Sequence, residues 1–171
     1  MSRGTVIQET GCNAFGLVGD EYRISVFVTG QPFEIPDYEA TRLRNEQKIG
    51  WYLNLSLTSD PKSIYWAHLI GHPRYPYVGV LQGGYYYAFG VWRSESYSLM
   101  ENSTNFYFTT ICRELIVRRI MALTGEDYTF DKFLAKDSDK DRHNLSKSRS
   151  QQLKDPERTP PPPLIREKTQ S

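Results

Sequence analysis

The stretch from Tyr75 to Trp92 constrains the fold of this chain more than any other part of the sequence. It reads YPYVGVLQGGYYYAFGVW, with aromatic and β-branched residues on both sides of the pair Gly83-Gly84. Such residues favour strands, and a two-residue Gly-Gly loop suits a type I′ turn because both of its central residues need positive φ. The pattern therefore predicts a β-hairpin with its turn at Gly83-Gly84.

Three earlier segments alternate apolar and polar residues with the two-residue period of a strand, namely residues 22–29, 49–57 and 64–70. Between the first two, residues 37–48 are strongly charged and contain no Gly or Pro, which predicts a short, mostly exposed helix capped by Asp37. Short turn-forming stretches join the later strands to the hairpin. Successive strands joined in this way predict an antiparallel meander.

From Ser103 to Thr124 the apolar spacing becomes helical, and Gly125 stands where a left-handed residue commonly ends a helix. Arg119 falls near the middle of the apolar face; in the simplest interpretation its stem covers apolar surface, and a buried ion pair or an anion site is the alternative. A further short helix is predicted over residues 128–134. The apolar face, expected to pack on the sheet, comprises Phe108, Ile111, Cys112, Leu115, Ile116, Ile120 and Leu123, whereas Arg113, Glu114 and Arg118 are expected to point outward.

These elements predict an α+β fold: one antiparallel sheet of five to six strands, covered on one face by the long C-terminal amphipathic helix. A chain of 171 residues can bury one core, and we assign it to a single domain over residues 1–136. Residues 137–171 hold few apolar side chains, which predicts a disordered tail. The tail has a basic, serine-bearing part and a polyproline part that is interpreted as a spacer, with a ligand or targeting role left open; its candidate residues are Lys147, Arg149, Pro160, Pro161, Pro162 and Pro163.

The formal net charge of +1 gives the whole chain no overall attraction to nucleic acid, anionic lipid or acidic substrates. The first ten residues lack the pattern of a secretory signal, and no window approaches the roughly 18 apolar residues of a membrane span. We therefore expect a cytoplasmic protein that is not secreted. A nuclear location and peripheral contact with a membrane stay open.

The sequence offers no arrangement typical of a catalytic, metal or cofactor site, so we expect neither an enzyme nor a bound cofactor. Gly83-Gly84 lacks the helix and the Lys that follow a phosphate-binding loop. His68 and His72 fall on a predicted strand and its turn, which is not metal-ligand spacing on one face. Cys112 is expected to be buried and inert, but Cys12 with one of these histidines stays open as the third function, a cysteine-dependent enzyme.

The surviving features are an aromatic strand and a charged tail, which favour a non-enzymatic interaction or self-assembly protein whose partner is another protein or a second copy. By analogy of fold, one form of this is a small, matrix-like structural protein of a virus. The alternative is a nucleic-acid-binding module that stacks bases on the aromatic strand. The candidate surface for either function comprises Tyr85, Tyr87, Phe89, Trp92, Arg74, Arg93 and Arg119.

Overall fold

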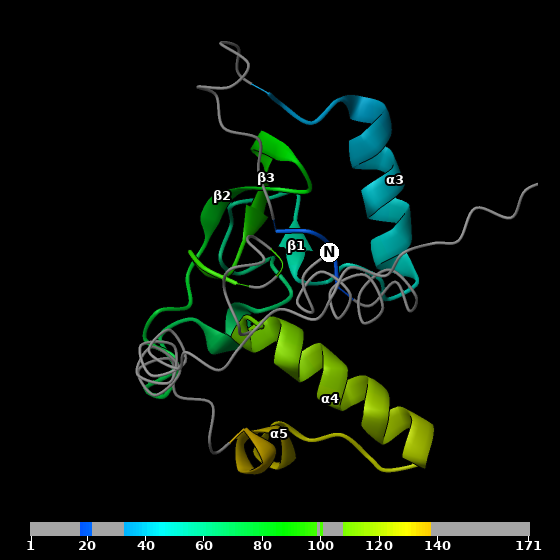
Figure 1. Cartoon of the computed structure of the whole chain (residues 1–171), viewed down its shortest axis with the longest axis vertical. Helices are drawn as coiled ribbons and strands as arrows, with labels where there is room; N and C mark the ends of the chain where they lie inside the picture. Colours follow the sequence, from blue (N-terminus) through cyan, green and yellow to red (C-terminus); the bar gives the residue numbers. More distant parts are fainter. Residues whose placement is uncertain (1–17, 22–32, 99, 101–107, 138–171) are drawn as a thin grey trace, which may run out of the picture. The chain divides into compact units, whose positions relative to one another are not determined.

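The computed structural model describes residues 18–21, 33–98, 100 and 108–137. The chain divides into two units, Met1–Ser138 and Asp139–Ser171, and all the described residues belong to the first. The predicted strand at residues 22–29 and the predicted tail after residue 137 lie outside the described residues. The described elements are α3 (Asp37–Lys48), β1 (Leu55–Ser56), a 3-10 helix η2 (Ala67–Leu69), β2 (Leu81–Gly84), β3 (Tyr87–Arg93), α4 (Thr110–Thr124) and α5 (Phe130–Lys136), as Figure 1 shows.

The sheet has three antiparallel strands in the described part of the chain, in the order β1-β3-β2. Arg93 of the central strand pairs with Leu55 of β1 on one side and with Leu81 of β2 on the other. An isolated parallel bridge joins Glu34 to Phe89. The predicted meander of five to six strands is therefore wrong for these residues.

Strands β2 and β3 form the predicted hairpin, but its turn is displaced by two residues. Gly84 pairs with Tyr87, which leaves Tyr85 and Tyr86 as the central residues of the turn. Their φ angles are +53° and +69°, the signs that a type I′ turn requires. Tyr85 is buried in a small core with Leu43 of α3, and this packing offsets the cost of left-handed tyrosines. Tertiary packing therefore overrides the preference of Gly-Gly for the turn.

The predicted strand over residues 49–57 is wrong except at β1. The chain instead folds back over the end of α3, where the backbone N–H groups of Ile49 and Trp51 both donate to the carbonyl of Glu46. Ile49 and Trp51, which the alternation places in the core, are 67% and 41% exposed. These hydrogen bonds satisfy the last carbonyls of α3. They favour a turn over residues 49–51 rather than the strand that the alternating sequence predicts.

The predicted strand over residues 64–70 is also wrong. Backbone N–H groups there bond carbonyls three residues earlier, from Leu69 to Trp66 and from Ile70 to Ala67, which forms turns and η2. Trp66 is fully buried, and its indole N–H donates to the carbonyl of Gly79 at 2.8 Å. A short apolar run fits a buried turn as well as a strand, so its periodicity alone did not settle the structure.

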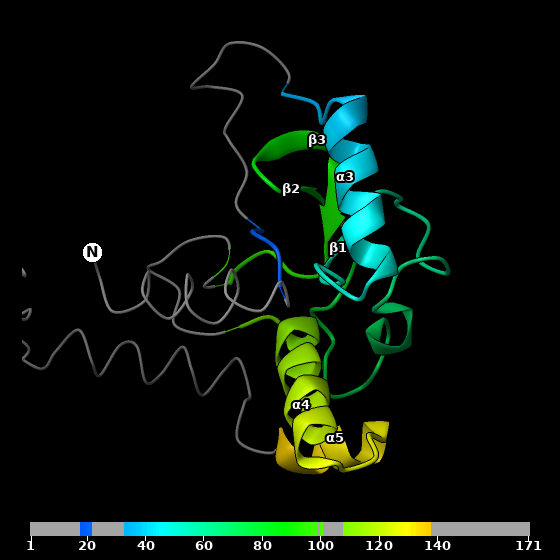
Figure 2. The same ribbon diagram turned by 90° about the vertical axis from the view of Figure 1, so that its right-hand side faces the viewer.

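The helix over residues 37–48 is mostly exposed, as predicted, but it is this helix, α3, that packs on the sheet. Helix α3 has the predicted bounds, although its N-cap is Pro36, which makes no side-chain cap bond. Its Leu43 is fully buried against Leu55 and Val91 of the sheet, so α3 is the helix that covers it. Both views place α3 beside the strands (Figures 1 and 2).

The predicted helix over residues 103–124 ends at Thr124 as expected but is shorter than predicted in the described residues, and residues 103–107 lie outside them. Helix α4 begins at Thr110, where the hydroxyl of Thr109 accepts a hydrogen bond from the backbone N–H of Cys112, and it ends at the left-handed Gly125. Its buried face packs against η2, the loop that follows and α5, in a core that holds Ile111, Cys112, Leu115, Trp66, Leu69, Tyr75 and Phe133. Helices α4 and α5 lie at the opposite end of the described part from the strands and α3 (Figure 2).

The outward and inward faces of α4 also differ from the prediction. Glu114, expected to point outward, is fully buried, while Ile120 and Leu123, expected in the core, are 55% and 68% exposed. Glu114 is stable there because its carboxylate has three partners: His68, Arg118 and the Tyr128 hydroxyl.

Among the described residues, no helix combines the length and the hydropathy that a membrane span would need.

Candidate binding site

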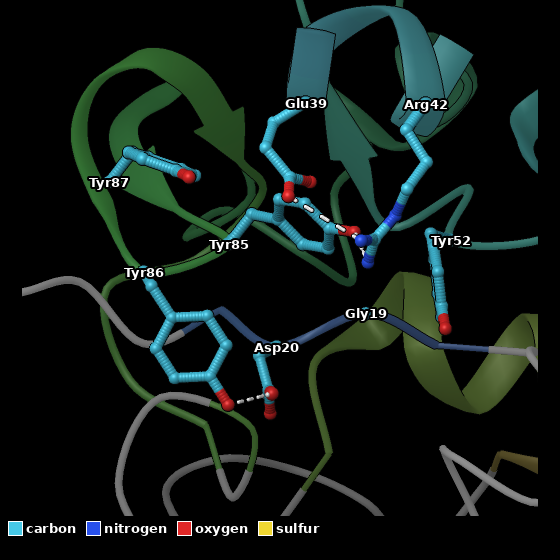
Figure 3. A pocket seen from close by; sticks show the side chains of 8 residues that line it. All are labelled: Gly19, Asp20, Glu39, Arg42, Tyr52, Tyr85, Tyr86 and Tyr87. Atoms are coloured by element: carbon cyan, nitrogen blue, oxygen red, sulfur yellow. Dashed lines mark hydrogen bonds and ion pairs between the residues drawn. The ribbon is translucent and has the colours of Figure 1, made fainter. Parts of the chain in front are cut away.

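A pocket of about 230 Å³ opens where the hairpin turn meets α3 (Figure 3). Its aromatic wall consists of four tyrosines, Tyr52, Tyr85, Tyr86 and Tyr87. Its charged wall consists of Asp20, Glu39 and Arg42, and Gly19 completes the lining. Four segments far apart in the sequence therefore build this site.

The segment around Gly19 and Asp20 is held against the turn by its own backbone. The Asn54 side chain both accepts from the Gly19 N–H, at 2.7 Å, and donates to the Gly19 carbonyl, at 2.9 Å. The Asp20 carbonyl accepts from the N–H of Tyr85 at 2.7 Å, and its carboxylate accepts from the hydroxyl of Tyr86 at 2.6 Å. A Cβ on Gly19 would come within 2.6 Å of the Leu55 Cδ1 methyl and 3.3 Å of the Tyr52 Cβ, so a larger residue would require these side chains to move.

Two members of the charged wall, Glu39 and Arg42, lie on one face of α3. The Arg42 guanidinium donates to the hydroxyl of Tyr85 at 2.8 Å and lies 3.4 Å from both Glu39 and Glu46. The second carboxylate oxygens of Glu39 and Glu46 are buried and have no hydrogen-bond partner among the described residues. Burial, and then the Glu46 carboxylate, raise the pKa of Tyr85. The pocket therefore contains an oxygen acceptor on Glu39 with unused capacity, and an environment that disfavours a further negative charge.

A row of five aromatic rings runs through the pocket. Neighbouring ring centroids are 5.1 Å apart for Phe33 and Tyr87, 6.4 Å for Tyr87 and Tyr85, and 6.2 Å for both Tyr85 with Tyr52 and Tyr52 with Trp51. These distances are typical of favourable aromatic pairs. The two ends of the row are exposed, Phe33 by 38% and Trp51 by 41%. We call these five side chains the aromatic row.

Backbone strain is concentrated at the same place. Within the described ranges, the non-glycine residues with positive φ are Tyr52, Tyr85 and Tyr86, at +52°, +53° and +69°. All three line the pocket. A left-handed conformation costs a bulky residue on the order of 1–3 kcal/mol, and such strain gathers at functional sites. The three strained tyrosines therefore support the pocket as the candidate functional site.

The structure brings together only part of the surface chosen from the sequence. Tyr85 and Tyr87 line the pocket, whereas Phe89 and Trp92 do not. Arg93 is buried, and its guanidinium donates to the carbonyls of Gln82, at 2.8 Å, and Gly83, at 2.6 Å. Arg74 bonds the carbonyls of Leu134 and Asp137, Arg119 is exposed on α4, and the candidate tail residues lie outside the described residues.

Sequence reasoning missed Tyr52, Tyr86, Arg42 and Asp20, and it interpreted Glu39 only as part of a charged helix start. The triplet Tyr85-Tyr86-Tyr87 was the available signal. Strand alternation sends Tyr86 to the opposite face from its neighbours, but in the turn all three tyrosines reach one pocket (Figure 3). Nothing in the sequence links residues 19–20 to residues 85–87.

A second polar cluster is buried behind the pocket. Glu21 accepts hydrogen bonds from Asn54 and Thr109 at 3.1 Å and from Ser98, and the thiol of Cys112 lies 3.5 Å from it. Burial raises the pKa of Glu21, although these donors oppose the shift. These hydrogen bonds form a structural network that fixes residue 21, which follows the pocket residue Asp20 in the chain.

A third cluster lies on α4, where His68 contacts the buried carboxylate of Glu114 at 2.8 Å. The second oxygen of Glu114 accepts from Arg118 and Tyr128, and the Arg118 guanidinium stacks 4.0 Å above the Tyr128 ring. Cys12, the proposed partner of a histidine, lies outside the described residues. Within the described ranges, no group of three or more His, Cys, Asp or Glu side chains is arranged to hold a metal ion.

Comparison with known protein families finds no family that matches this chain. A comparison with curated protein sequences finds no match either.

Proposed function

We propose that this protein is a non-enzymatic interaction protein that self-associates through the aromatic row and the tyrosine pocket. The observation that supports this most directly is the row itself, which continues from a buried pocket to exposed rings at both ends. Tyrosine and tryptophan dominate the residues that contribute most to protein interfaces, because they offer large, rigid contact surfaces. The exposed rings at the two ends of the row, Phe33 and Trp51, suit contact with the surface of another protein molecule.

The size of the pocket supports the same proposal. Sites for drug-sized ligands and cofactors usually measure about 300–1,000 Å³. A volume of about 230 Å³ is below that range and suits one side chain of a partner. The surrounding exposed rings, Phe33, Trp51 and Tyr86, would then contact the rest of the partner.

The nucleic-acid alternative receives less support from the same residues. Arg93 has its guanidinium committed to main-chain carbonyls inside the protein, and Arg74 bonds two more carbonyls. The pocket carries two carboxylates, Asp20 and Glu39, which would repel phosphates. The alternative stays a prediction that rests on the basic tail residues. A matrix-like viral role, a cytoplasmic location and the cysteine-dependent enzyme stay predictions as well.

Light scattering on size-exclusion chromatography, across a series of protein concentrations, tests the proposal. We expect the mass of the full chain to grow with concentration. Trp51→Ala removes an exposed end of the row and should weaken association about tenfold, the effect of a side chain that contributes a little over 1 kcal/mol to an interface.

Leu123→Ala is the matched control, because Leu123 is also an exposed apolar side chain but lies on α4, outside the row. It should leave the association constant unchanged. A constant monomer mass at every concentration would overturn the proposal, and so would equal effects of the two substitutions.

A further inference from the structure

We infer that the tyrosine pocket binds the ammonium or guanidinium group of a Lys or Arg side chain from the partner. This inference rests on the proposed function and names the chemistry of its contact. Three features of the pocket support it: its charge, its unused hydrogen-bond acceptor and the aromatic faces that surround it.

The charge of the pocket is negative. Among the described lining residues, Asp20 and Glu39 are acidic and Arg42 is basic. The Arg42 guanidinium lies 3.4 Å from both Glu39 and Glu46, so at this wall one cation faces two carboxylates. The resulting field attracts a cation and repels an anion.

A buried oxygen of Glu39 provides the hydrogen-bonding capacity. Glu39 lines the pocket, and its second carboxylate oxygen finds no donor among the described residues. A buried acceptor without a donor costs on the order of 1–3 kcal/mol, more when it is charged. An ammonium group offers three donors and a guanidinium five, so either group would remove this cost.

The tyrosine faces provide the second attraction. A cation is attracted to the face of an aromatic ring when it lies within about 6 Å of the centroid. The pocket already contains one such contact, because the Arg42 guanidinium lies 5.9 Å from the centroid of Tyr85. The environment disfavours negative charge: burial, followed by the carboxylate of Glu39, raises the pKa of Tyr87.

The C-terminal segment of a second copy is a source of this side chain that the sequence itself supplies. Residues 138–171 contain eight Lys or Arg and five Asp or Glu, a net charge of +3, whereas residues 1–137 carry a net charge of −2. Two copies are thus complementary in charge, and Lys147 and Arg149 lie in a run without acidic residues. A basic segment of a different protein has the same chemistry, so the test separates the two sources.

The first experiment titrates the full chain with single amino-acid probes while the backbone amide signals of Asp20 and Tyr86 are followed by NMR. N-acetyl-arginine amide and N-acetyl-lysine amide should cause saturable shifts. N-acetyl-glutamine amide, which is neutral, and inorganic phosphate should not. Equal shifts with the neutral probe, or stronger shifts with phosphate, would overturn the inference.

Glu39→Gln provides the matched substitution, since it removes the charge and keeps the shape. We expect it to weaken binding of the arginine probe about fivefold, which is the upper value for a solvent-accessible ion pair. Asp37→Asn removes a charge from the same helix outside the pocket and should leave the affinity unchanged. Equal affinity of the wild type and Glu39→Gln would overturn the inference even if both bind.

Self-association of full-length variants identifies the source. Replacing the eight Lys and Arg residues of 138–171 by Gln should weaken self-association if these side chains enter the pocket of a second copy. If the arginine probe binds but this variant associates normally, the cationic site stands and its ligand belongs to another protein.

The failures of the two proposals are distinguishable. Association that depends on Trp51 but not on Glu39 would keep the proposed function and overturn the cationic ligand. Binding of the arginine probe by a chain that stays monomeric at every concentration would keep the cationic site and overturn self-association.

Discussion

Tyr85 and Tyr86 show how one residue type carries both a structural cost and a binding surface. Each lies in the left-handed region, where glycine is at ease and a residue with a Cβ is strained by roughly 1–2 kcal/mol. Tyr85 recovers this cost by burial and by its bond to Arg42. Tyr86 is 48% exposed, and its hydroxyl donates to the Asp20 carboxylate at 2.6 Å.

The positive φ of Tyr86 predicts that glycine at this position gives a more stable protein than alanine does. Tyr86→Gly and Tyr86→Ala both lose the hydrogen bond to Asp20, but only alanine keeps the strained φ. We expect the glycine variant to be more stable by about 1 kcal/mol, the reverse of the ranking in regular structure. Urea unfolding of the two variants measures the difference. A more stable alanine variant would show that the turn is not left-handed at this position.

Glu95 predicts a dependence of stability on pH. It is 1% exposed, and its pKa is raised to about 7, chiefly by burial, with Glu21 adding to the shift and the Thr110 N–H opposing it. Because the folded pKa exceeds the unfolded value, the folded state binds more protons. Stability conferred by the protonated form is therefore complete below about pH 4.5 and is lost as the pH rises through about 7.

Glu95→Gln tests this assignment, because glutamine keeps the shape without the charge. We expect it to remove most of the loss of stability between acidic and mildly alkaline pH, a loss on the order of 3 kcal/mol. Urea unfolding on both sides of neutrality measures the effect. An unchanged pH dependence in the variant would assign the proton to another group, with Glu21 the first candidate.

At the scale of elements, α5 is fastened to α4 by one residue just beyond its end. The Asp137 carboxylate accepts from the Arg113 guanidinium at 2.7 and 2.9 Å and from the Tyr75 hydroxyl at 2.9 Å. Both charged side chains are largely buried, with exposed fractions of 12% for Arg113 and 4% for Asp137. The pair therefore lies within the core of this end of the unit.

Removing the Asp137 charge should leave a buried guanidinium without its partner, which costs on the order of 3 kcal/mol or more. We expect Asp137→Asn to lose that much stability, and Asp131→Asn, at an exposed position of α5, to change it by less than about 0.5 kcal/mol. Thermal or urea unfolding compares the two. Similar stabilities of both variants would mean that the pair contributes no net stability.

The packing of α3 on the sheet makes a second prediction at this scale. Leu43→Ala should cost about 2–4 kcal/mol, because Leu43 is fully buried between α3 and the sheet. Ile120→Ala should change stability by no more than about 0.5 kcal/mol, since Ile120, which the sequence placed in the core, is 55% exposed on α4. The opposite order of costs would show that Ile120, and not Leu43, is the buried side chain.

For the whole molecule, the distribution of charge predicts a salt dependence. Residues 138–171 and residues 1–137 carry net charges of +3 and −2. Attraction between copies through these charges should weaken as salt shortens the screening length to a few ångströms. We expect the mass measured by light scattering to fall with salt. A mass that rises with salt would assign association to apolar contact alone, without the cationic side chain.

Local signals determined those features that depend on a few neighbouring residues. The charged run without Gly or Pro placed α3 at its bounds, Gly125 ended α4 in the left-handed conformation, and the aromatic segments paired as a hairpin. The physical reason is that helix propensity, terminal glycine and strand pairing across a short loop act over only a few residues.

Tertiary structure alone decided the turn at Tyr85-Tyr86, the burial of Glu114, the coil at residues 49–54 and the pocket. The turn, the burial of Glu114 and the pocket depend on partners far apart in the chain, such as Asn54 with Gly19 or His68 with Glu114. The coil depends on how the end of α3 is satisfied. Periodicity reports which side chains prefer burial but not what will cover them. Helix termination, core packing and long-range hydrogen bonds made that choice, and with it they brought residues 19–20, α3, Tyr52 and the hairpin turn to one site.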